Sequence, residues 1–376
     1  MKKSPHLVIV AGEDSGDFHG ANLATALQCH SPGIKLSGIG GSKMEESGVE
    51  LIFPSARLAV IGLTEVLGRI SDIRAGRKAI REHLLKVQPD LLILIDFPGF
   101  NLHLVAPFAH KLKIPIIYYI SPKVWAWRQG RVATINRLID RVLVILPFEK
   151  EFFEQHNVAV EYVGNPLLDD FASFRSLDRR QNHNIALIPG SRSGEIKRLL
   201  PEMITAARLY LREQPESRFL IPIAPSVKFA DIEKLIPANF REYVTLLRQP
   251  LATLLDDVSF ALVTSGTATL ETALAEIPMV VIYKVNQLSY MIGKRLIKVP
   301  FISLVNLIAG KEIVPELIQA EARPEKIVRQ MRDIRDDKIR YNNTVDNLRE
   351  LKSRLGKPGA AQRAALAIID ELRNHE

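Results

Sequence analysis

The chain has 376 residues, 47% of them hydrophobic and 24% charged, which suits a folded protein of about two domains and excludes dominant disorder. Its single cysteine, Cys29, excludes an internal disulfide framework and a cysteine cage for zinc or an iron–sulfur cluster. The net charge of +8 suits an anionic small molecule, an acidic membrane surface or nucleic acid, and does not choose among them.

The chain holds no run of the ~18 apolar residues that a membrane-spanning helix needs. Its start, Met1-Lys2-Lys3, carries the charge of a signal peptide, but the apolar stretch behind it covers only 7–11. A signal peptide needs roughly 7–15 apolar residues there. We therefore expect a cytoplasmic protein whose first apolar run is a β-strand.

Short, continuous apolar runs alternate with segments of helical period along the whole chain. Runs of this kind are typical of parallel strands buried on both faces, so the alternation predicts a doubly wound α/β architecture. The expected strands are 7–11, 91–95, 115–120, 142–146, 185–188, 219–223, 244–247, 260–263 and 279–283, and the expected helices include 17–29, 76–87, 197–213 and 267–276.

The polar, turn-rich segment 163–184 separates the chain into two halves. We expect one Rossmann-like domain over 1–165, a second over 166–345, and a helical segment over 346–376 for which packing back on the first domain is one option. The charged tail predicts solvated helix faces rather than a nucleic-acid site, so no nucleic-acid partner is expected.

Clusters of polar and small residues follow five of the expected strands directly. Parallel strands end at the same edge of a sheet, and ligands bind in the crevice at that edge. If the two sheets face each other, all five loops line one cleft. The loops are 12–17, 96–101, 121–128, 189–192 and 264–267.

The last two loops indicate a bound diphosphate. Each opens a helix, where free N–H groups and the positive end of the helix dipole attract an anion. Gly190 and Gly266 allow a close backbone approach, and the guanidinium of Arg192 can hold a phosphate. Ordinary N-capping is the alternative. The hydroxyl donors of these loops are Ser191, Thr264, Ser265 and Thr267.

Two other nucleotide motifs are missing from the chain. No GxxxxGK[ST] loop supports an ATPase, and no GxGxxG opens a helix after a strand, which disfavours a dinucleotide oxidoreductase. The glycines at 38–41 are interpreted as a turn. The nine histidines show no paired ligand spacing, so no metal is expected.

Two acidic residues are candidates for a general base. Asp96 stands at the end of an expected strand before Pro98 and Gly99, where it is held firmly and partly desolvated. An Asx-turn that only shapes the loop is the alternative. Glu13 also faces the expected cleft, whereas Asp17 is interpreted as a helix cap.

Two further segments are open to more than one interpretation. The loop with Trp125, Trp127 and Arg128 either grips a sugar or lipid or packs between domains. The apolar segment 58–70, followed by a basic one, suits an element on an anionic membrane surface, or else a core helix followed by a solvated one. Its candidate membrane residues are Leu63, Val66, Leu67, Arg74, Arg77, Lys78 and Arg81.

Taken together, these loops resemble the lipid-A-disaccharide synthase family, inverting glycosyltransferases with the two-Rossmann-domain GT-B fold. The most specific blocks are SPKVWAWR at 121–128 and NLIAGKEIVPEL at 306–317, while PGSR and TSGTATLE indicate only the broad class. The resemblance also runs through AGEDSGD at 11–17, LAVIGLTEVL at 58–67, DFPGFN at 96–101 and LPFEKEFF at 146–153.

Four positions depart from the family's pattern: Asp14 stands in place of a small residue and His19 in place of an aliphatic one. Gly99 stands where many members carry a second Asp, which leaves Asp96 as the stronger carboxylate of its loop. Asn165 replaces the usual His, so a catalytic role for the family's His is in doubt here.

The resemblance implies transfer of 2,3-diacylglucosamine from its UDP derivative to 2,3-diacylglucosamine 1-phosphate (lipid X), with a β-1,6 disaccharide and UDP as products. The first domain then binds the acceptor and meets the anionic inner membrane peripherally from the cytoplasm, and the second binds UDP. No cofactor is implied, and a homodimer is a further candidate assembly. The implied nucleotide contacts add Glu195, Glu271, Asn306 and Gln319, and the implied acceptor residues are Ser15, Gly16, Asn101, Ser121, Trp125, Trp127 and Arg128.

Three alternatives remain at this stage. A UDP-sugar 2-epimerase or a glycosyltransferase with a soluble acceptor shares the fold, but would not need the apolar and basic stretch 58–86. A nucleotide-gated binding module at the membrane surface is the non-catalytic alternative. Turnover of a UDP-sugar with an acylated acceptor separates it from an enzyme.

Overall fold

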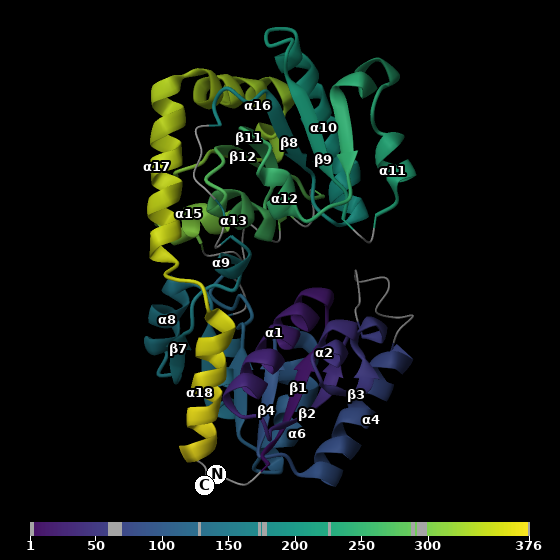
Figure 1. The fold of residues 1–376 in the computed structure, drawn as a ribbon, viewed down its shortest axis with the longest axis vertical. Helices are drawn as coiled ribbons and strands as arrows, with labels where there is room; N and C mark the ends of the chain where they lie inside the picture. The colour runs from purple at the N-terminus through teal and green to yellow at the C-terminus, as the bar shows by residue number, and fades with distance from the viewer. Residues whose placement is uncertain are drawn as a thin grey trace. The chain divides into compact units, whose positions relative to one another are not determined.

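The computed structural model describes residues 4–58, 70–126, 129–171, 174, 179–224, 227–286, 290–291 and 299–374. The chain divides into two compact units (Figure 1). Unit 1 consists of Met1–Pro166 with Lys357–Glu376, and unit 2 of Leu167–Gly356. The helix that ends at Arg354 belongs to unit 2, and the last described helix belongs to unit 1.

Unit 1 is built on a seven-stranded sheet in the order β3-β2-β1-β4-β5-β6-β7, and every neighbouring pair is parallel. The strands are β1 (His6–Ala11), β2 (Lys35–Gly40), β3 (Glu50–Pro54), β4 (Leu91–Ile95), β5 (Ile116–Tyr119), β6 (Arg141–Val144) and β7 (Val160–Tyr162).

Successive side chains of these strands enter two different cores. Leu7 and Ile9 face helices α1 and α18, while Val8 and Val10 face α4, α6 and α7. Burial on both faces explains why the strands are continuous apolar runs. The helices of unit 1 are α1 (Asp14–His30), α2 (Ser42–Glu46), α4 (Ile70–Val87), α5 (Pro98–Phe100), α6 (Ala106–Lys111), α7 (Arg131–Leu138), α8 (Pro147–Glu154) and α18 (Ala360–Asn374), with short turns η1 (Ser55–Arg57) and η2 (Asn101–Val105).

Helix α18 completes the core of unit 1 from the far end of the chain. It packs on α1 and contributes Ala364, Ala365 and Ile368 to the buried cluster. Arg363 donates from Nε to the carbonyl oxygen of Val163 at 2.7 Å. The C-terminal helix is therefore part of the unit that the N-terminus begins.

Unit 2 repeats the plan with a six-stranded sheet in the order β10-β9-β8-β11-β12-β13, again wholly parallel. Its strands are β8 (Asn184–Ile188), β9 (Arg218–Pro222), β10 (Val244–Leu247), β11 (Phe260–Thr264), β12 (Met279–Tyr283) and β13 (Glu316–Ile318). Its helices are α9 (Leu167–Asp170), α10 (Ser193–Leu211), α11 (Phe229–Glu233), α12 (Leu251–Leu255), α13 (Thr267–Leu274), α15 (Leu304–Ala309), α16 (Pro324–Met331) and α17 (Lys338–Arg354), with turns η3 (Ala238–Tyr243), η4 (Gln319–Glu321) and η5 (Arg332–Asp336).

The strand order defines a topological switch point in each unit. In unit 1 the order runs from β3 back to β1 and then from β4 to β7, and in unit 2 it runs from β10 back to β8 and then from β11 to β13. The direction of winding therefore reverses between β1 and β4, and between β8 and β11. Rossmann folds bind their ligands at this switch point, beyond the carboxyl ends of the strands. The relevant loops are those that follow these four strands.

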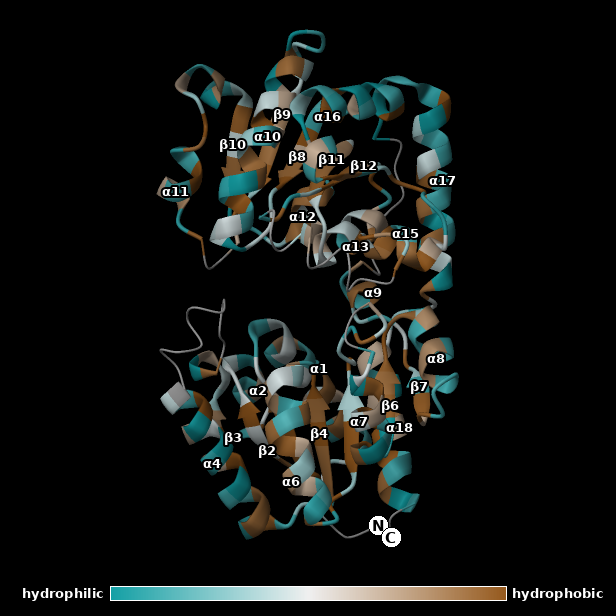
Figure 2. Cartoon of the chain, turned by 180° about the vertical axis from the view of Figure 1, so that it is seen from behind, coloured by the Kyte–Doolittle hydropathy of each residue, from teal (hydrophilic) through white to brown (hydrophobic). Residues whose placement is uncertain are grey.

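The nine expected strands and the doubly wound, parallel α/β class are confirmed, and Figure 2 shows the strands as the hydrophobic layer of each unit. The interpretation of 38–41 as a turn is wrong, because Gly38 to Gly40 belong to β2. A Cβ atom on Gly38 would lie 1.8 Å from the carbonyl oxygen of Ile9, so only glycine allows β1 and β2 to pair there. The short strands β3, β7 and β13 also lay outside the sequence prediction.

Candidate functional site

At the switch point of unit 1, Asp96 follows β4 in a strained turn. Asp96 and Phe97 have φ angles of 42° and 50°, in the left-handed region that costs energy for residues other than glycine. Tyr118, fully buried on β5, donates from its hydroxyl to the Asp96 carbonyl oxygen at 2.5 Å. Asn101 donates from Nδ2 to the same oxygen at 2.8 Å. These bonds hold the turn that aims the Asp96 carboxyl.

The loop after β1 interlocks with this turn. A Cβ atom on Gly12 would lie 2.1 Å from the ring of Phe97, so the absence of a side chain at Gly12 makes room for the ring. Glu13 is the next residue, an exposed N-cap of α1 in extended conformation. Gly12 was not among the predicted site residues, although it stands within the quoted motif.

The carboxyl of Asp96 is tuned by its surroundings. Burial and, second to it, the nearby charge of Glu13 raise its pKa to about 6, while the Phe97 amide and the Lys123 charge act in the opposite direction. Asp96 is thus ionised at neutral pH and close enough to its pKa to accept and release a proton. Perturbed carboxyls of this kind mark functional sites.

The loop after β5 lies next to the Asp96 turn in the sheet. Ser121 and Trp125 are both buried, and both donate to the carboxylate of Glu149 on α8. The Trp125 ring meets Phe148 edge-on at 4.8 Å. Trp125 is therefore packed within unit 1 and does not present a free ring face, while Trp127 and Arg128 lie outside the described residues.

The other predicted residues of this edge differ in exposure. Ser15 is exposed in the first turn of α1, and Gly16 is buried against Ala11. Asp17 caps α2 rather than α1, because its carboxylate accepts from the amides of Gly41, Lys43 and Met44. In the last segment before unit 2, the buried Asn165 donates from Nδ2 to the Ile145 carbonyl oxygen at 3.2 Å.

At the switch point of unit 2, the loop after β8 presents a cation. Gly190 has a φ of 99°, and a Cβ atom there would lie 2.7 Å from a carboxylate oxygen of Glu195. Arg192 is the N-cap of α10 and donates to Glu195 at 3.1 Å. Its side chain remains 70% exposed, so the guanidinium has donors left for an anion.

The loop after β11 lies beside it and opens α13. Thr264 is buried at the strand end, and Ser265 donates from its hydroxyl to the carbonyl oxygen of Ile302 at 2.9 Å. Gly266 is the N-cap of α13 and Thr267 its exposed first residue. One turn further on, burial and, second to it, the charge of Asp170 raise the pKa of Glu271 to about 7.

Asn306 and Gln319 have internal roles. Asn306 is completely buried; its amide donates to Val314 and Glu316 and accepts from the amides of Ile313 and Val314. The Gln319 side chain bonds both the amide and the carbonyl of Val285. Asn306 thus orders the segment between α15 and β13, with its amide already occupied by protein groups.

The described part of the predicted membrane surface lies on α4. Arg74, Arg77 and Lys78 are exposed there, and Leu85 is exposed two turns further along the same helix. Arg81 is not free, because its guanidinium lies over the Phe108 ring at 4.3 Å. Leu63, Val66 and Leu67 fall outside the described residues.

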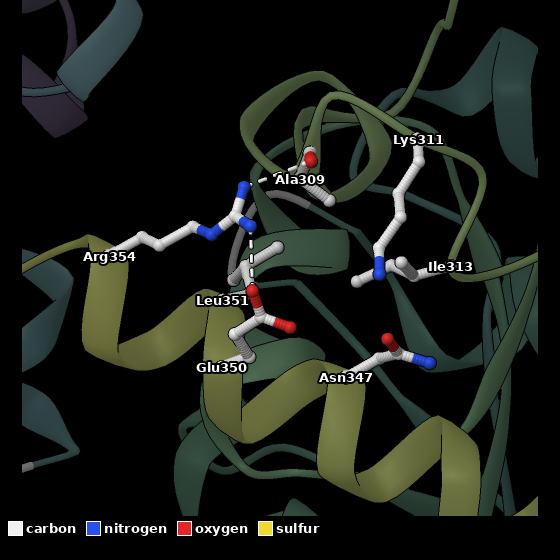
Figure 3. Close-up of a pocket in the computed structure, with 7 residues that line it drawn as sticks. All are labelled: Ala309, Lys311, Ile313, Asn347, Glu350, Leu351 and Arg354. Atoms are coloured by element: carbon white, nitrogen blue, oxygen red, sulfur yellow. Dashed lines mark hydrogen bonds and ion pairs between the residues drawn. The ribbon is translucent and has the colours of Figure 1, made fainter.

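Among the described residues, no group of histidine, cysteine and acidic side chains is arranged to hold a metal ion. The same part of the chain contains no helix whose length and apolar character would let it cross a membrane. A shallow hollow between α15 and α17 contains none of the predicted residues, and Arg354 and Glu350 close one side of it with an ion pair (Figure 3). The hollow is lined by Ala309, Lys311, Ile313, Asn347, Glu350, Leu351 and Arg354.

Three residues that matter at these edges were missed by sequence reasoning. Glu149 and Glu316 bond several partners each, and Lys123 acts on Asp96 through its charge. The position of Glu149 three residues into a helix that begins with Pro147 was a usable signal. Lys123 and Glu316 stand within the two most specific blocks of the family resemblance, 121–128 and 306–317, and that was the available signal for both.

Two Rossmann-like units, each with a wholly parallel sheet and polar loops at its switch point, define the GT-B class. Solved structures with this arrangement include the Staphylococcus aureus MnaA–UDP co-structure, with a TM-score of 0.68 and 12% identity over 98% of this chain and 97% of that one. Acinetobacter baumannii MurG matches with a TM-score of 0.61 and 14% identity over 97% and 99% of the two chains. At these identities the likeness concerns the fold alone.

Sequence relatives identify the family within this class. The profile of the lipid-A-disaccharide synthetase family matches residues 7–368. The lipid-A-disaccharide synthase of Syntrophus aciditrophicus is 44% identical over 96% of this chain and 97% of its own length. That of Myxococcus xanthus is 40% identical over 99% of both chains. The chain belongs to the lipid-A-disaccharide synthase family, and it is a glycosyltransferase of lipid A biosynthesis.

Proposed function

We propose that the chain transfers 2,3-diacylglucosamine from its UDP derivative to lipid X, and that Asp96 is the general base. The observation that carries the assignment is the strained, partly buried Asp96 at the switch point of unit 1. The attacking 6-hydroxyl of the acceptor must lose a proton as it forms the new bond, and a positioned carboxylate near its pKa takes that proton efficiently. Inversion is a single displacement, so one base suffices.

Glu13 is the weaker candidate for the base. It is exposed, and its extended backbone at the start of α1 carries no strain. Its charge raises the pKa of Asp96, so it supports the proton-accepting function of Asp96. Ser15 and Gly16 of α1 and Asn101 and Ser121 beyond β4 and β5 form the rest of the proposed acceptor side.

Unit 2 binds the UDP-sugar donor in this proposal. Negative charge grows on UDP as it leaves, and it is stabilised by the Arg192 guanidinium and by the free amides at the starts of α10 and α13. Gly190 and Gly266 keep the backbone accessible there. Glu195 positions Arg192 from the next turn of α10. The hydroxyls of Ser191 and Thr267 are exposed donors on the same loops.

The proposal also includes binding of the protein to a membrane surface and its self-association as a homodimer. Both substrates carry acyl chains, and exposed cations on α4 suit the headgroups of an anionic inner membrane from the cytoplasmic side. Self-association as a homodimer is tested by sedimentation velocity over a range of protein concentrations.

The deciding experiment incubates the protein with the acylated UDP-sugar, with and without lipid X. Release of UDP together with an acylated disaccharide only when lipid X is present supports the transfer. Appearance of an epimerised UDP-sugar without acceptor would instead support a 2-epimerase, and binding without any turnover would support a nucleotide-gated module.

A further inference from the structure

Glu149 carries more hydrogen bonds than its place in a helix explains. It is the third residue of α8 and only 2% exposed. Its Oε2 accepts from the amides of Leu146 at 3.0 Å and Ile145 at 3.3 Å. Acidic residues at this position often satisfy free amides at a helix start. Those two bonds occupy Oε2 and leave Oε1 of the carboxylate available for another partner.

The second oxygen binds a different element. Oε1 accepts from Nε1 of Trp125 at 2.9 Å and from Oγ of Ser121 at 3.3 Å. Indole nitrogen is a donor only, so this bond requires an acceptor at Glu149. Because Ser121 is the first residue of the segment 121–126 and Trp125 the last but one, one buried carboxylate ties the loop to α8 near both of its ends.

The tied loop lies beside the proposed base. Strand β5 runs between β4 and β6, and the amide of Asp96 donates to the carbonyl oxygen of Tyr119 at 3.4 Å. The exposed Lys123 stands in the middle of the loop. It is near enough to Asp96 for its positive charge to lower the pKa of that carboxyl. The position of this charge therefore depends on what anchors the loop.

We propose that Glu149 is a positioning residue of the transfer reaction, which holds the 121–126 loop through Trp125 and Ser121 so that the positive charge of Lys123 continues to act on the Asp96 carboxyl. The inference rests on the proposed role of Asp96 as the base. Glu149 itself touches neither substrate. Its effect on the reaction passes through the loop to the ionisation of Asp96.

Other charged and titratable groups of the described residues surround the two carboxyls. Glu13 and the buried hydroxyl of Tyr118 face Asp96 together with Lys123. The phenol of Tyr162 on β7 faces Glu149, and Arg363 of α18 lies near that phenol. Burial raises the pKa of Glu149 to about 7, and its four donors act against the shift. All four donors match the ionised form.

The test measures the pKa of Asp96 directly, by carbon-13 NMR of protein labelled at aspartate carboxyls, with Asp96→Asn used for assignment. Lys123→Met removes the charge and should raise this pKa, because a nearby positive charge favours the ionised carboxyl. Glu149→Gln should also raise this pKa, because glutamine keeps one acceptor oxygen and turns an NH2 donor toward either the loop donors or the amides at the start of α8. Trp125→Phe should do so to a smaller extent.

Kinetics provide a second measurement on the same variants. In Glu149→Gln the acid limb of kcat/KM should move to higher pH with the Asp96 pKa. For each unit of that shift, kcat/KM should fall up to about tenfold at pH values below the Asp96 pKa and change little at pH 8, because only the ionised fraction of the base changes. The KM for the UDP donor should not change. Glu151→Gln is the matched control, since Glu151 is exposed on the same helix.

An unchanged Asp96 pKa in both Glu149→Gln and Trp125→Phe would overturn the proposal. If Glu149→Gln does not fold, Trp125→Phe decides alone, because it leaves the start of α8 intact. The NMR measurement needs no turnover, so it tests the anchor even if the wild-type protein makes no disaccharide. Absence of turnover in the wild type would instead count against the proposed function.

Discussion

The two units share a strand order but carry opposite chemistry at their switch points. In unit 1 the loops after β1 and β4 bring together two carboxyls, and burial raises the pKa of Asp96. In unit 2 the loops after β8 and β11 present an exposed arginine and two helix starts. The first arrangement suits proton removal and the second suits an anion. The same backbone plan thus serves two tasks through a few loop residues.

The largest expected effect is the loss of activity when Asp96 is replaced, which separates proton removal in unit 1 from anion binding in unit 2. Asp96→Asn should lower disaccharide formation by about 10²–10⁴-fold, the usual contribution of a general base, and leave UDP affinity unchanged. Initial rates and calorimetry with UDP measure the two quantities. Asp14→Asn, an exposed change on α1, is the control. Near-normal turnover of the Asp96 variant would transfer the role to Glu13.

A second prediction assigns the membrane surface to unit 1. Replacement of Arg74, Arg77 and Lys78 by glutamine should weaken binding to anionic vesicles roughly a hundredfold, since each cation contributes about 1 kcal/mol near such a surface. Vesicle sedimentation measures it. The same substitutions at Lys197, Arg208 and Arg212 in unit 2 remove an equal charge and should have little effect. Equal losses in both sets would refute a specific surface on α4.

A third prediction concerns the anion site of unit 2. Arg192→Ala should weaken UDP binding about tenfold to a hundredfold, because a hydrogen bond to a charged group contributes about 1.5–3 kcal/mol. Calorimetry at two salt concentrations gives the affinity. Arg208→Ala, exposed further along α10, should bind UDP like the wild type. Unchanged affinity in the Arg192 variant would place the diphosphate elsewhere.

The smallest expected effect tests the geometry of the unit 1 edge. Gly12→Ala should lower the free energy of unfolding by about 1–3 kcal/mol, because the new methyl group meets the Phe97 ring. Urea denaturation measures it. Gly99→Ala, in the same turn but with no atom within 4 Å of the added Cβ, should change it by less than about 0.5 kcal/mol. Equal stability of the two variants would mean that the interlock is unimportant.

Local sequence predicted the central strands but not those with weak local signals. Strand β2 contains glycines at 38 and 40, and β7 and β13 have three residues each at the ends of their sheets. Their pairing is stabilised by neighbours far along the chain. Lys123 and Glu149 were missed for the same reason, because their importance depends on Asp96 and Trp125, which lie in other loops.

The sequence by itself determined the alternation of buried strands and helices, the glycines and caps at the strand ends, and the motifs that resemble the family, since each depends on neighbouring residues. Only the tertiary structure decided the strand order, and with it the meeting of the loops after β1 and β4. It also decided that α18 joins unit 1 and that Trp125 is buried on Glu149. These features depend on contacts between distant segments, which no local pattern encodes.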